Sequence, residues 1–472
     1  MNRRWWLLII VFVLTSCASV SPPKQASGNQ PFPAPREFRA MWIATVANID
    51  WPSKRGLSAD QQRQEMRQIV AAARRLKLNA LVLQVRPSAD AIYPSKLEPW
   101  TEYLSGTQGV PTAANYDPLA EWIQLAHSEC MELHAWFNPY RARHSTESSA
   151  PASNHVSKSL PHAVKNYGPM QWLDPGEPDA ARHTLAVIAD VVRRYDIDGV
   201  HLDDYFYPYP IPAPLEPTAV AAKAANVAQP TIAAKAAPTT PLIPPSETRP
   251  DLDFPDEPSW QSYKKAGGKL TRADWRRDNV NQLVKTLYRD VHALKPWVKV
   301  GISPFGLPKP GRRPEGVTGF SQYDKLYADV ELWFEQGWLD YLAPQLYWPI
   351  AQEAQAFPLL LRYWASINKQ SRHLWPGLFT SRIDESDKSW LPEEITRQIA
   401  LLRSQSGATG HIHFSAAAIV QNRRGIADAL AASTYVNEVR IPETPWLASR
   451  PPICAAPGSG PAKSPANASA KP

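Results

Sequence analysis

The sequence predicts an α/β fold, a (β/α)8 barrel (TIM barrel) with long loops at its active face. From Phe38 onward, short β-branched or aromatic runs alternate with longer amphipathic stretches, which is typical of a parallel sheet wrapped by crossover helices. Eight such runs occur over about four hundred residues, and barrels of this class span from ~250 to more than 400. An open doubly wound sheet is the alternative, but no glycine-rich phosphate loop follows the first run.

The strands are expected where β-branched and aromatic residues cluster, in the order Phe38–Val46, Asn79–Pro87, Glu132–Tyr140, Gly199–Tyr205, Lys299–Gly306, Tyr341–Trp348, His373–Ser381 and Gly410–Ile419. Helical periodicity indicates crossover helices between and after them, for example Ala59–Leu76, Pro118–Met131, Ala181–Tyr195, Asn279–Leu294, Glu393–Ser404 and Arg424–Ala431. We therefore expect residues 36–440 to form one barrel domain.

The N-terminus has the layout of an export signal. Two arginines precede an apolar run over residues 5–14, which is shorter than the ~20 residues that a membrane span needs. Residues 14–17 (Leu-Thr-Ser-Cys) then match the bacterial lipobox, in which the cysteine thiol is acylated. We expect residues 1–16 to be a lipoprotein signal peptide and Cys17 to carry a fatty-acyl anchor such as palmitate. An ordinary signal peptide with an incidental cysteine is the alternative.

Three segments have a composition that does not favour packed structure. Residues 17–35 are rich in Ser, Pro, Gln and Gly, which is typical of a tether. Residues 209–258 are rich in Ala, Pro and Thr, so we expect a flexible insertion after the fourth strand, and residues 441–472 form a Pro/Ala-rich tail. Position 18 is not aspartate, which by resemblance to lipoprotein sorting in enteric bacteria predicts a lipid-anchored protein of the outer membrane, facing the periplasm.

Charge and cysteine usage exclude several classes of protein. There are 51 Lys and Arg against 44 Asp and Glu, a net charge of +7, and no basic block is longer than a pair such as Arg312-Arg313. This argues against a nucleic-acid partner. Cys130 lies in an apolar helical stretch and Cys454 in the tail, so we expect a buried thiol and no disulfide framework. His411 and His413 alternate on a strand without a third ligand nearby, so we expect no metal site and no cofactor.

Aromatic content and strand ends locate the expected chemistry. The eighteen Trp exceed what a core needs, and exposed aromatic rings near carboxylates are surfaces on which sugar rings stack. Active sites of such barrels lie at the C-terminal ends of the strands, which discards Asp198 and Asp340 because they precede strands. The polar and aromatic residues that remain are Asp50, Arg86, Asp90, Asn138, Arg141, Asp203, Asp204, Gln345, Tyr347, Trp348, Ser381, Arg382, His413 and Ser415.

The strongest cluster is residues 198–205 (Asp-Gly-Val-His-Leu-Asp-Asp-Tyr) on the fourth strand. Alternation directs His201 and Asp203 into the barrel and leaves Asp204 at its rim. Two adjacent carboxylates suit glycoside hydrolysis, in which one protonates the leaving oxygen and another attacks or activates water. The alternatives are structural, with one Asp capping the loop and the other pairing with Arg86 or Arg141, or metal binding, for which further acidic ligands are lacking.

Several sequence blocks resemble the glycosyl-hydrolase-like family ten. They are Arg39–Ile43, Leu83–Pro87, Ala135–Tyr140, Asp198–Tyr207, Gly301–Gly306 and Tyr341–Trp348, and the resemblance extends from Arg36 to about Val439. Members are barrel-domain envelope lipoproteins and include a division-site glycosidase of enteric bacteria that cleaves glycan strands stripped of stem peptides. The resemblance implies a peptidoglycan glycosidase with Asp203 and Asp204 in its acidic motif, and cell-division proteins as partners. The low-complexity insertion departs from the compact loop of the family.

A second comparison concerns mechanism. Chitinase-like enzymes carry Asp-Gly-x-Asp-x-Asp-x-Glu on strand four and let the substrate's acetamido group attack. This chain keeps Asp198, Gly199 and Asp203 of that frame, but His201 and Tyr205 replace its other two acids. The acid expected at the end of strand seven in the largest glycosidase clan is also missing. Retaining, inverting and substrate-assisted mechanisms therefore all stay open.

The working hypothesis makes Asp204 the general acid and Asp203 the charge-stabilising or orienting carboxylate. The residues expected to contact substrate are Trp42, Arg86, Trp136, Asn138, Arg141, His201, Tyr205, Gln345, Tyr347 and Trp348. For the tryptophans, core packing is an equal alternative. A non-catalytic glycan-binding lipoprotein and a hydrolase of another secreted polysaccharide are the competing functions, since a fold alone does not decide between them.

Overall fold

The computed structural model describes residues 35–213, 250–450 and 453. Its main sheet is entirely parallel, with the order β10-β9-β8-β7-β3-β2-β1-β12-β11. The strands of this sheet are β1 (Phe38–Ile43), β2 (Ala80–Arg86), β3 (Glu132–Phe137), β7 (Gly199–Leu202), β8 (Lys299–Ile302), β9 (Tyr341–Leu342), β10 (His373–Leu374), β11 (Gly377–Leu378) and β12 (Gly410–His413).

One broken strand closes the sheet into a barrel. β10 and β11 belong to a single segment that is interrupted at Trp375 and Pro376, where the proline has no amide hydrogen for a ladder. β10 pairs with β9, and β11 pairs with β12, so the segment joins the two ends of the sheet. The nine ladder pieces are therefore eight barrel strands, which confirms the predicted fold class.

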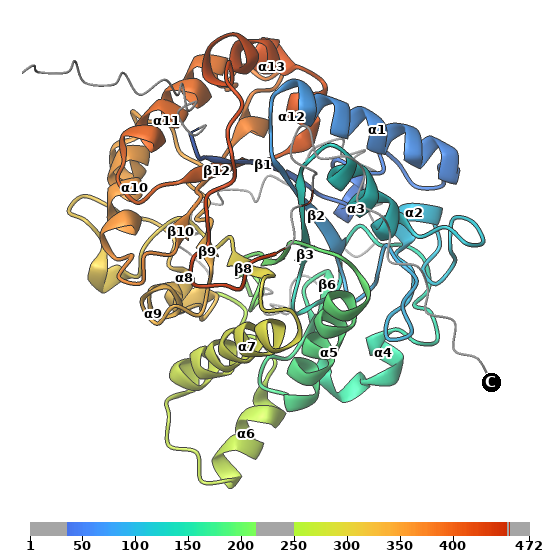
Figure 1. Ribbon diagram of the computed structural model, residues 1–472. Coiled ribbons are helices and arrows are strands. Elements are labelled where there is room, and N and C mark those ends of the chain that lie inside the picture. Colours follow the sequence, from blue (N-terminus) through green and yellow to red (C-terminus); the bar gives the residue numbers. More distant parts are fainter. Residues whose placement is uncertain (1–34, 214–249, 451–452, 454–472) are drawn as a thin grey trace, which may run out of the picture. The chain divides into compact units, whose positions relative to one another are not determined.

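Helices follow the strands and surround the barrel, as Figure 1 shows. α1 begins after a capping box formed by Ser58 and Gln61, and several others begin with proline, which fits the first helical turn. The outer helices are α1 (Ala59–Arg75), α3 (Pro118–Ser128), α5 (Pro178–Arg194), α7 (Arg272–Leu294), α9 (Val330–Glu335), α10 (Phe357–Ser366), α11 (Pro392–Ser404) and α12 (Ala416–Val420). Among the described residues, no helix is long and apolar enough to cross a membrane.

Smaller elements occupy the loops. β4 (Arg141–Arg143), β6 (Met170–Leu173) and β5 (Val164–Tyr167) form an antiparallel sheet in the loop after β3. The remaining short helices are α2 (Glu102–Ser105), α4 (Val156–Ser159), α6 (Glu257–Lys265), α8 (Gln322–Lys325) and α13 (Ile426–Ala429). α6 and the start of α7 form a hairpin that projects from the barrel (Figure 1).

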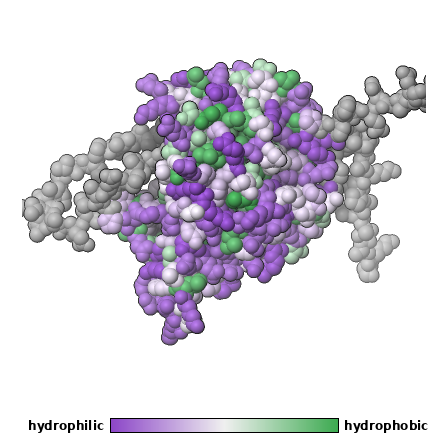
Figure 2. All heavy atoms as spheres, turned by 90° about the vertical axis from the view of Figure 1, so that its left-hand side faces the viewer, coloured by the Kyte–Doolittle hydropathy of each residue, from purple (hydrophilic) through white to green (hydrophobic). Residues whose placement is uncertain are grey.

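The barrel wall separates two apolar cores. Side chains inside the barrel include Trp42, Val82 and Trp136, and the larger core fills the space between the strands and the helices. Val200 and Leu202 belong to the outer core, as their alternation predicts. On the outside, hydrophobic side chains form small groups between hydrophilic ones on the face drawn in Figure 2.

Polar side chains inside the barrel form one hydrogen-bonded chain. The indole N–H of Trp42 donates to Nε2 of His201 (3.1 Å), whose Nδ1 lies 3.0 Å from the hydroxyl of Tyr341. That hydroxyl lies 2.9 Å from Nδ1 of His134, and Nε2 of His134 lies 3.0 Å from Glu132. Burial lowers the pKa of both histidines, so neutral imidazoles link the chain. His201 points into the barrel, as predicted.

Asp198 and Asp340 serve the opposite, N-terminal end of the barrel. The carboxylate of Asp198 accepts the amide hydrogen of Leu133 (2.9 Å), and that of Asp340 accepts the amide hydrogen of Val300 (2.8 Å). The indole of Trp446 also donates to Asp340 (2.8 Å). The start of the expected tail is thus held against the barrel, and its residues after 450 lie almost entirely outside the described part of the chain.

The expected insertion is shorter at both ends than its composition indicated. The hydroxyl of Tyr209 donates to Asp204, and the carboxylate of Asp256 is fully buried in ion pairs with Arg272 and Arg276. These charged and aromatic residues lie next to the low-complexity run, so averaging the composition over 209–258 concealed them. Residues 214–249, together with the predicted signal peptide and Cys17, lie outside the described residues.

Cys130 corrects the cysteine prediction. Its side chain is exposed and disulfide-bonded, so the expected buried, free thiol is wrong. Two cysteines far apart in sequence give no spacing signal, because only the fold determines which of them meet.

Arg86, at the end of β2, is fully buried in an ion pair. Its guanidinium bonds Glu98 through Nη2 (2.5 Å) and Nε (2.9 Å), and Nη1 donates to the carbonyl of Asn138 (2.6 Å). Burial alone would raise the pKa of Glu98, but Arg86 and His183 lower it to about 2. The pair fixes the loop after β2 to the end of β3. The expected contact of Arg86 with substrate is not supported, because its side chain has no exposed surface.

Replacing Arg86 with methionine is expected to lower the free energy of unfolding by about 3–5 kcal/mol, because the buried carboxylate of Glu98 loses its main partner. The matched control is Arg63→Met, which removes a two-bond pair with Glu121 whose side chains are 34% and 33% exposed. That variant should lose at most ~1 kcal/mol. Denaturant unfolding of the three proteins measures both changes, and equal losses would contradict the structural role of Arg86.

Candidate active site

Asp203 lies just beyond β7 and is held by the neighbouring strand. The parallel register pairs Trp136 with His201 and Phe137 with Leu202, so the residue that follows β3, Asn138, lies beside the residue that follows β7, Asp203. The indole N–H of Trp136 donates to Oδ2 of Asp203 (3.1 Å), and the side-chain amide of Asn138 donates to the same oxygen. The carboxylate is 3% exposed, so its position is set by these donors and not by solvent.

A glutamine on β2 orients the donor side chain of Asn138. Nε2 of Gln84 donates to Oδ1 of Asn138 (2.6 Å), which leaves the amide of Asn138 directed at Asp203. Oε1 of Gln84 accepts the backbone amides of Thr45 and Val46, each at 2.9 Å. The ends of β1, β2, β3 and β7 are therefore connected by one series of hydrogen bonds.

Asp204 is the second carboxyl at this end of the barrel and is also 3% exposed. The hydroxyl of Tyr209 donates to its Oδ2, and Gln345 also hydrogen-bonds it. Gln345 is itself fixed, because its Nε2 donates to the carbonyl of Ser303 (2.9 Å). Asp203 is thus held from the β3 side and Asp204 from the β8 and β9 side.

Burial controls the protonation of both carboxyls. Removal from water raises the pKa of Asp203 to about 7, with the Arg141 guanidinium opposing this and Asp204 adding to it. Burial likewise raises the pKa of Asp204 to about 6, opposed by the hydrogen bond from Tyr209. Two interacting carboxyls that titrate near neutrality can hold one proton and one negative charge together. That combination is what acid-assisted glycoside cleavage requires.

The charge of Arg141, on β4, opposes the rise in the pKa of Asp203. Its guanidinium lies 4.4 Å from the centre of the Tyr205 ring, and Nη1 donates to the carbonyl of Pro87 (3.2 Å). Arg141 and Tyr205 therefore contact each other beside the acid pair, and the amide of Tyr205 donates to Asp203 (3.3 Å). Neither carboxyl forms a direct ion pair with Arg86, so the structural alternative based on that pairing is not supported.

The predicted aromatic residues divide into a buried and a half-buried group. Trp42 is 2% exposed, Trp348 is 6% exposed and Trp136 is 7% exposed, so the barrel packs most of each ring. Tyr205 and Tyr347 are half-buried and keep surface at this end. The glycine at 377 allows Trp42 and Tyr347 to approach, because a Cβ there would lie within 2.9 Å and 3.2 Å of their rings.

The other residues selected at strand ends have structural partners. Asp50 accepts the hydroxyl of Ser415 (2.7 Å) and the amides of Ala44 and Ala417 (2.8 Å each), which ties β1 to the loop after β12. His413 lies between Thr380 and the hydroxyl of Tyr435 on the outer side of β12, opposite the inward-facing Ile412. Among the described residues, no group of three or more His, Cys, Asp or Glu is arranged to hold a metal ion.

Three aromatic residues near Asp204 were not anticipated. Tyr209 was assigned to the insertion, Phe305 lies beyond Ile302, where β8 ends before the end of the predicted fifth strand, and Phe320 lies in the long loop after β8. Their rings form a continuous group, with 5.2 Å between the centroids of Tyr209 and Phe320 and 5.0 Å between those of Phe305 and Phe320. The only available signal was their aromatic character next to turn residues.

The chain is similar to known glycosyl hydrolases. The model of the family described as Glycosyl hydrolase-like 10 matches residues 37–392. Glycosyl hydrolase YngK of Bacillus subtilis (strain 168) is 38% identical over 426 residues, 88% of this chain and 75% of that protein. Glycosyl hydrolase DigH of Escherichia coli (strain K12) is 31% identical over 413 residues, 81% of this chain and 83% of that protein.

Solved structures were also compared. The glycoside hydrolase domain of PgaB (BpsB) from Bordetella bronchiseptica has 15% sequence identity and a TM-score of 0.47, over 84% of this chain and 98% of that one. The catalytic domain of β-amylase from Paenibacillus polymyxa has 12% identity and a TM-score of 0.48, over 82% of this chain and 94% of that one. The barrel assignment rests on the strand pairing described above.

The raised pKa values predict how an Asp203→Asn variant changes stability with pH. A carboxyl with a higher pKa in the folded state binds its proton more tightly there, so stability falls as the pH rises from about 4 to about 7. The variant lacks this loss, and its free energy of unfolding relative to wild type should increase by a few kcal/mol between pH 4 and 8, at 1.36 kcal/mol per pKa unit. Unfolding at several pH values measures it.

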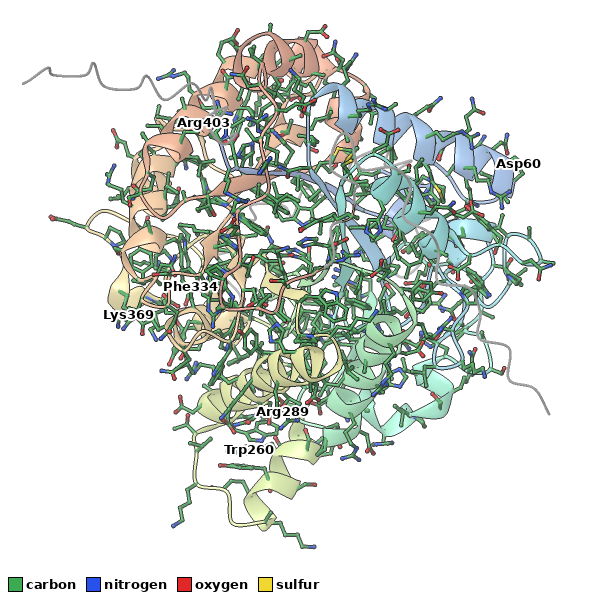
Figure 3. The ribbon with its side chains drawn as sticks, viewed as in Figure 1. Asp60, Trp260, Arg289, Phe334, Lys369 and Arg403 are labelled. Carbon is green, nitrogen blue, oxygen red and sulfur yellow. The ribbon has the colours of Figure 1, made fainter. Side chains whose placement is uncertain are left out.

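The control for this experiment is Asp60→Asn, on the exposed start of α1 (Figure 3), where the side chain is 91% exposed. Its stability difference from wild type should stay nearly constant over the same range. A constant difference for Asp203→Asn as well would show that burial does not hold the proton on this carboxyl.

Proposed function

Because the chain belongs to the glycosyl hydrolase-like 10 family, we propose that it is a glycoside hydrolase that cleaves a cell-envelope glycan, namely the glycan strands of peptidoglycan. The observation that supports the enzymatic function most is the buried pair Asp203 and Asp204 at the C-terminal end of β7. Both carboxyls titrate near neutrality, and glycoside hydrolysis needs one protonated and one ionised carboxyl at the same place.

The two carboxyls are proposed to have different roles. The pair shares one proton near neutrality, and in the form that has this proton on Asp204, the carboxylate of Asp203, which accepts two N–H donors on one oxygen, would stabilise positive charge that develops at the anomeric carbon. Asp204 is held by the hydroxyl of Tyr209 and would donate its proton to the leaving oxygen. Gln345 hydrogen-bonds Asp204, and Tyr347 lies close enough to feel its charge. Both side chains would contact the sugar and position it.

The proposed substrate follows from the proposed location. If Cys17 is acylated, a tether of residues 17–35 spans at most ~60 Å when fully extended, at ~3.3–3.6 Å per residue. A barrel on such a tether at the periplasmic side of the outer membrane reaches polymers close to that membrane, and peptidoglycan is the nearest. Glycan strands freed of stem peptides, and recruitment by cell-division proteins, are finer parts of the same proposal, supported by the family resemblance.

The test of the roles is the kinetics of Asp204→Asn. Loss of a general acid is expected to lower the rate on purified glycan strands by about 10²–10⁴-fold. The loss should be much smaller on an aryl glycoside whose leaving group needs no proton. Asp203→Asn should impair both substrates, because charge development at the anomeric carbon is common to them.

Asp60→Asn serves as the control and should keep wild-type rates. Undiminished cleavage by Asp204→Asn would refute its role as the acid. If wild type cleaves no envelope glycan, with or without stem peptides, but binds one, the protein is a glycan-binding lipoprotein. New reducing ends from another secreted polysaccharide alone would exclude peptidoglycan as the substrate.

A further inference from the structure

His201, on β7, packs against the residue that holds Asp203. Its ring meets the ring of Trp136 edge to face, with 6.4 Å between the centroids and an angle of 90°. Trp136 is the β3 partner of His201 in the sheet, and its indole donates to Asp203. The side chain of His201 has no exposed surface, so it influences a bound substrate only through such neighbours.

The same imidazole also contacts the support of Asp204. Nε2 of His201 lies 2.9 Å from the hydroxyl of Ser303, the residue that follows β8. The carbonyl of Ser303 accepts the side-chain amide of Gln345, and Gln345 hydrogen-bonds Asp204. His201 is therefore connected to Asp203 through one residue and to Asp204 through two.

The position of the hydrogen on His201 is determined by Trp42. An indole N–H can only donate, so Nε2 of His201, 3.1 Å away, accepts and has no hydrogen of its own. Burial lowers the pKa of His201, so the ring is neutral and its single hydrogen lies on Nδ1. Nδ1 then donates to the hydroxyl of Tyr341 (3.0 Å). The hydroxyl hydrogen of Tyr341 is left for Nδ1 of His134, at 2.9 Å.

The opposite end of this hydrogen-bonded chain imposes the same arrangement. Burial would raise the pKa of Glu132, but the charge of Lys299 and the hydrogen bond to His134 lower it, so the ionised carboxylate only accepts. Nε2 of His134, 3.0 Å from Glu132, therefore carries the hydrogen of that ring and leaves Nδ1 to accept from Tyr341. Donors and acceptors thus match at every bond from Trp42 to Glu132.

Two glycines make room for these polar rings inside the barrel. A Cβ at Gly199 would lie 2.5 Å from the ring of His134, and one at Gly301 would lie 2.0 Å from the ring of Tyr341. The sheet register places each glycine directly opposite the ring that it accommodates. Apolar side chains could fill the same space without burying polar groups, at little or no loss of stability. Filling the barrel therefore does not by itself account for the hydrogen-bonded chain.

We propose that His201 is a positioning residue for both carboxyls of the candidate site, and that the hydrogen-bonded chain from Glu132 to Tyr341 holds it as the Nδ1–H tautomer. This inference rests on the proposed glycosidase function and identifies residues beyond the acid pair on which that function depends. With its hydrogen on Nδ1, His201 offers an acceptor to the indole of Trp42. With its hydrogen on Nε2, it would direct a second donor at that indole, and the ring would have to move.

The test compares two deletions of a single hydroxyl in the full-length protein. Tyr341→Phe removes the hydroxyl between His201 and His134, and Tyr435→Phe removes a hydroxyl between the two buried histidines of β12. Both tyrosines are buried, so both variants should lower the melting temperature by similar amounts. Tyr341→Phe should lower kcat on glycan strands by about 10–100-fold and change KM by less than ~2-fold, because misplaced groups cost rate. Tyr435→Phe should keep the wild-type kcat.

Two substitutions of His201 separate hydrogen bonding from packing. A glutamine at this position has an amide oxygen that can accept from Trp42, whereas a leucine only fills the space. His201→Gln should therefore keep about 5-fold more kcat than His201→Leu, the equivalent of one hydrogen bond. Equal kcat values in the two folded variants would contradict the positioning role.

Two NMR measurements test the inference without any substrate. In protein with 15N-labelled histidine, His201 of wild type should be neutral with its hydrogen on Nδ1 between about pH 5 and pH 8. In protein with 13C-labelled aspartate, the pKa of Asp203 should rise in Tyr341→Phe, because displaced donors stabilise its carboxylate less. The same pKa should stay at its wild-type value in Tyr435→Phe.

Two results would overturn the inference and leave the proposed function intact. One is a wild-type His201 that is protonated or has its hydrogen on Nε2. The other is a folded Tyr341→Phe protein with wild-type kcat and an unchanged titration of Asp203, which would make the hydrogen-bonded chain structural. Absence of any hydrolysis by wild type would instead refute the proposed function, while the tautomer of His201 and the titration of Asp203 would still decide whether His201 positions that carboxyl.

Discussion

The series of hydrogen bonds that runs across the ends of four adjacent strands is the interaction on which the candidate site depends. It begins at the backbone amides of Thr45 and Val46, passes through Gln84 to Asn138, and ends on the carboxylate of Asp203. Each of these side chains is buried, so each bond matters, because a buried polar group without a partner costs about 1–3 kcal/mol. The parallel register of the strands places Gln84, Asn138 and Asp203 side by side.

This arrangement also explains why the carboxyls titrate near neutrality. The donors fix the position of Asp203, but they do not compensate fully for its removal from water, and burial remains the largest effect on its pKa. Arg86, one of the two arginines considered as a partner for the acid pair, is engaged by Glu98. Arg141 acts only electrostatically and stays over the Tyr205 ring. A direct ion pair with Asp203 would lower the pKa of that carboxyl, and the pair would then no longer share a proton near neutrality.

The barrel could be predicted from the sequence because its signal is repetitive. Alternating strand runs and helical periods recur along the chain, and each of the eight expected strands coincides with a ladder. Some predicted strands extend several residues beyond the observed ones, because extended chain continues after the hydrogen-bonded pairing of the sheet has ended. In the predicted strand Tyr341–Trp348, for example, only Tyr341–Leu342 pairs in the sheet. Prolines at 344 and 349 keep such segments extended without ladder amides. α7 begins at Arg272, earlier than its apolar period indicated.

Of the candidate site, only the residues that lie at the ends of predicted strands could be predicted from the sequence. Asp203, Asp204 and Asn138 follow from strand ends, because parallel strands bring their C-terminal ends together. The partner of Arg86 did not follow, since Glu98 lies twelve residues along a loop with no periodic pattern. Tyr209, Phe305 and Phe320 were missed for the same reason: loops after β7 and β8 bring them together in space, and no spacing in the sequence records it.

The most direct measurement is a crystal structure of the Asp204→Asn variant with a glycan oligosaccharide bound. A bridging glycosidic oxygen is expected within ~2.6–3.2 Å of the side chain of residue 204, the reach of a general acid. The sugar on one side of that oxygen should lie beside Asp203 and contact Gln345 and Tyr347. An oligosaccharide bound elsewhere, with no sugar beside Asp203, would contradict the proposed roles of the two carboxyls.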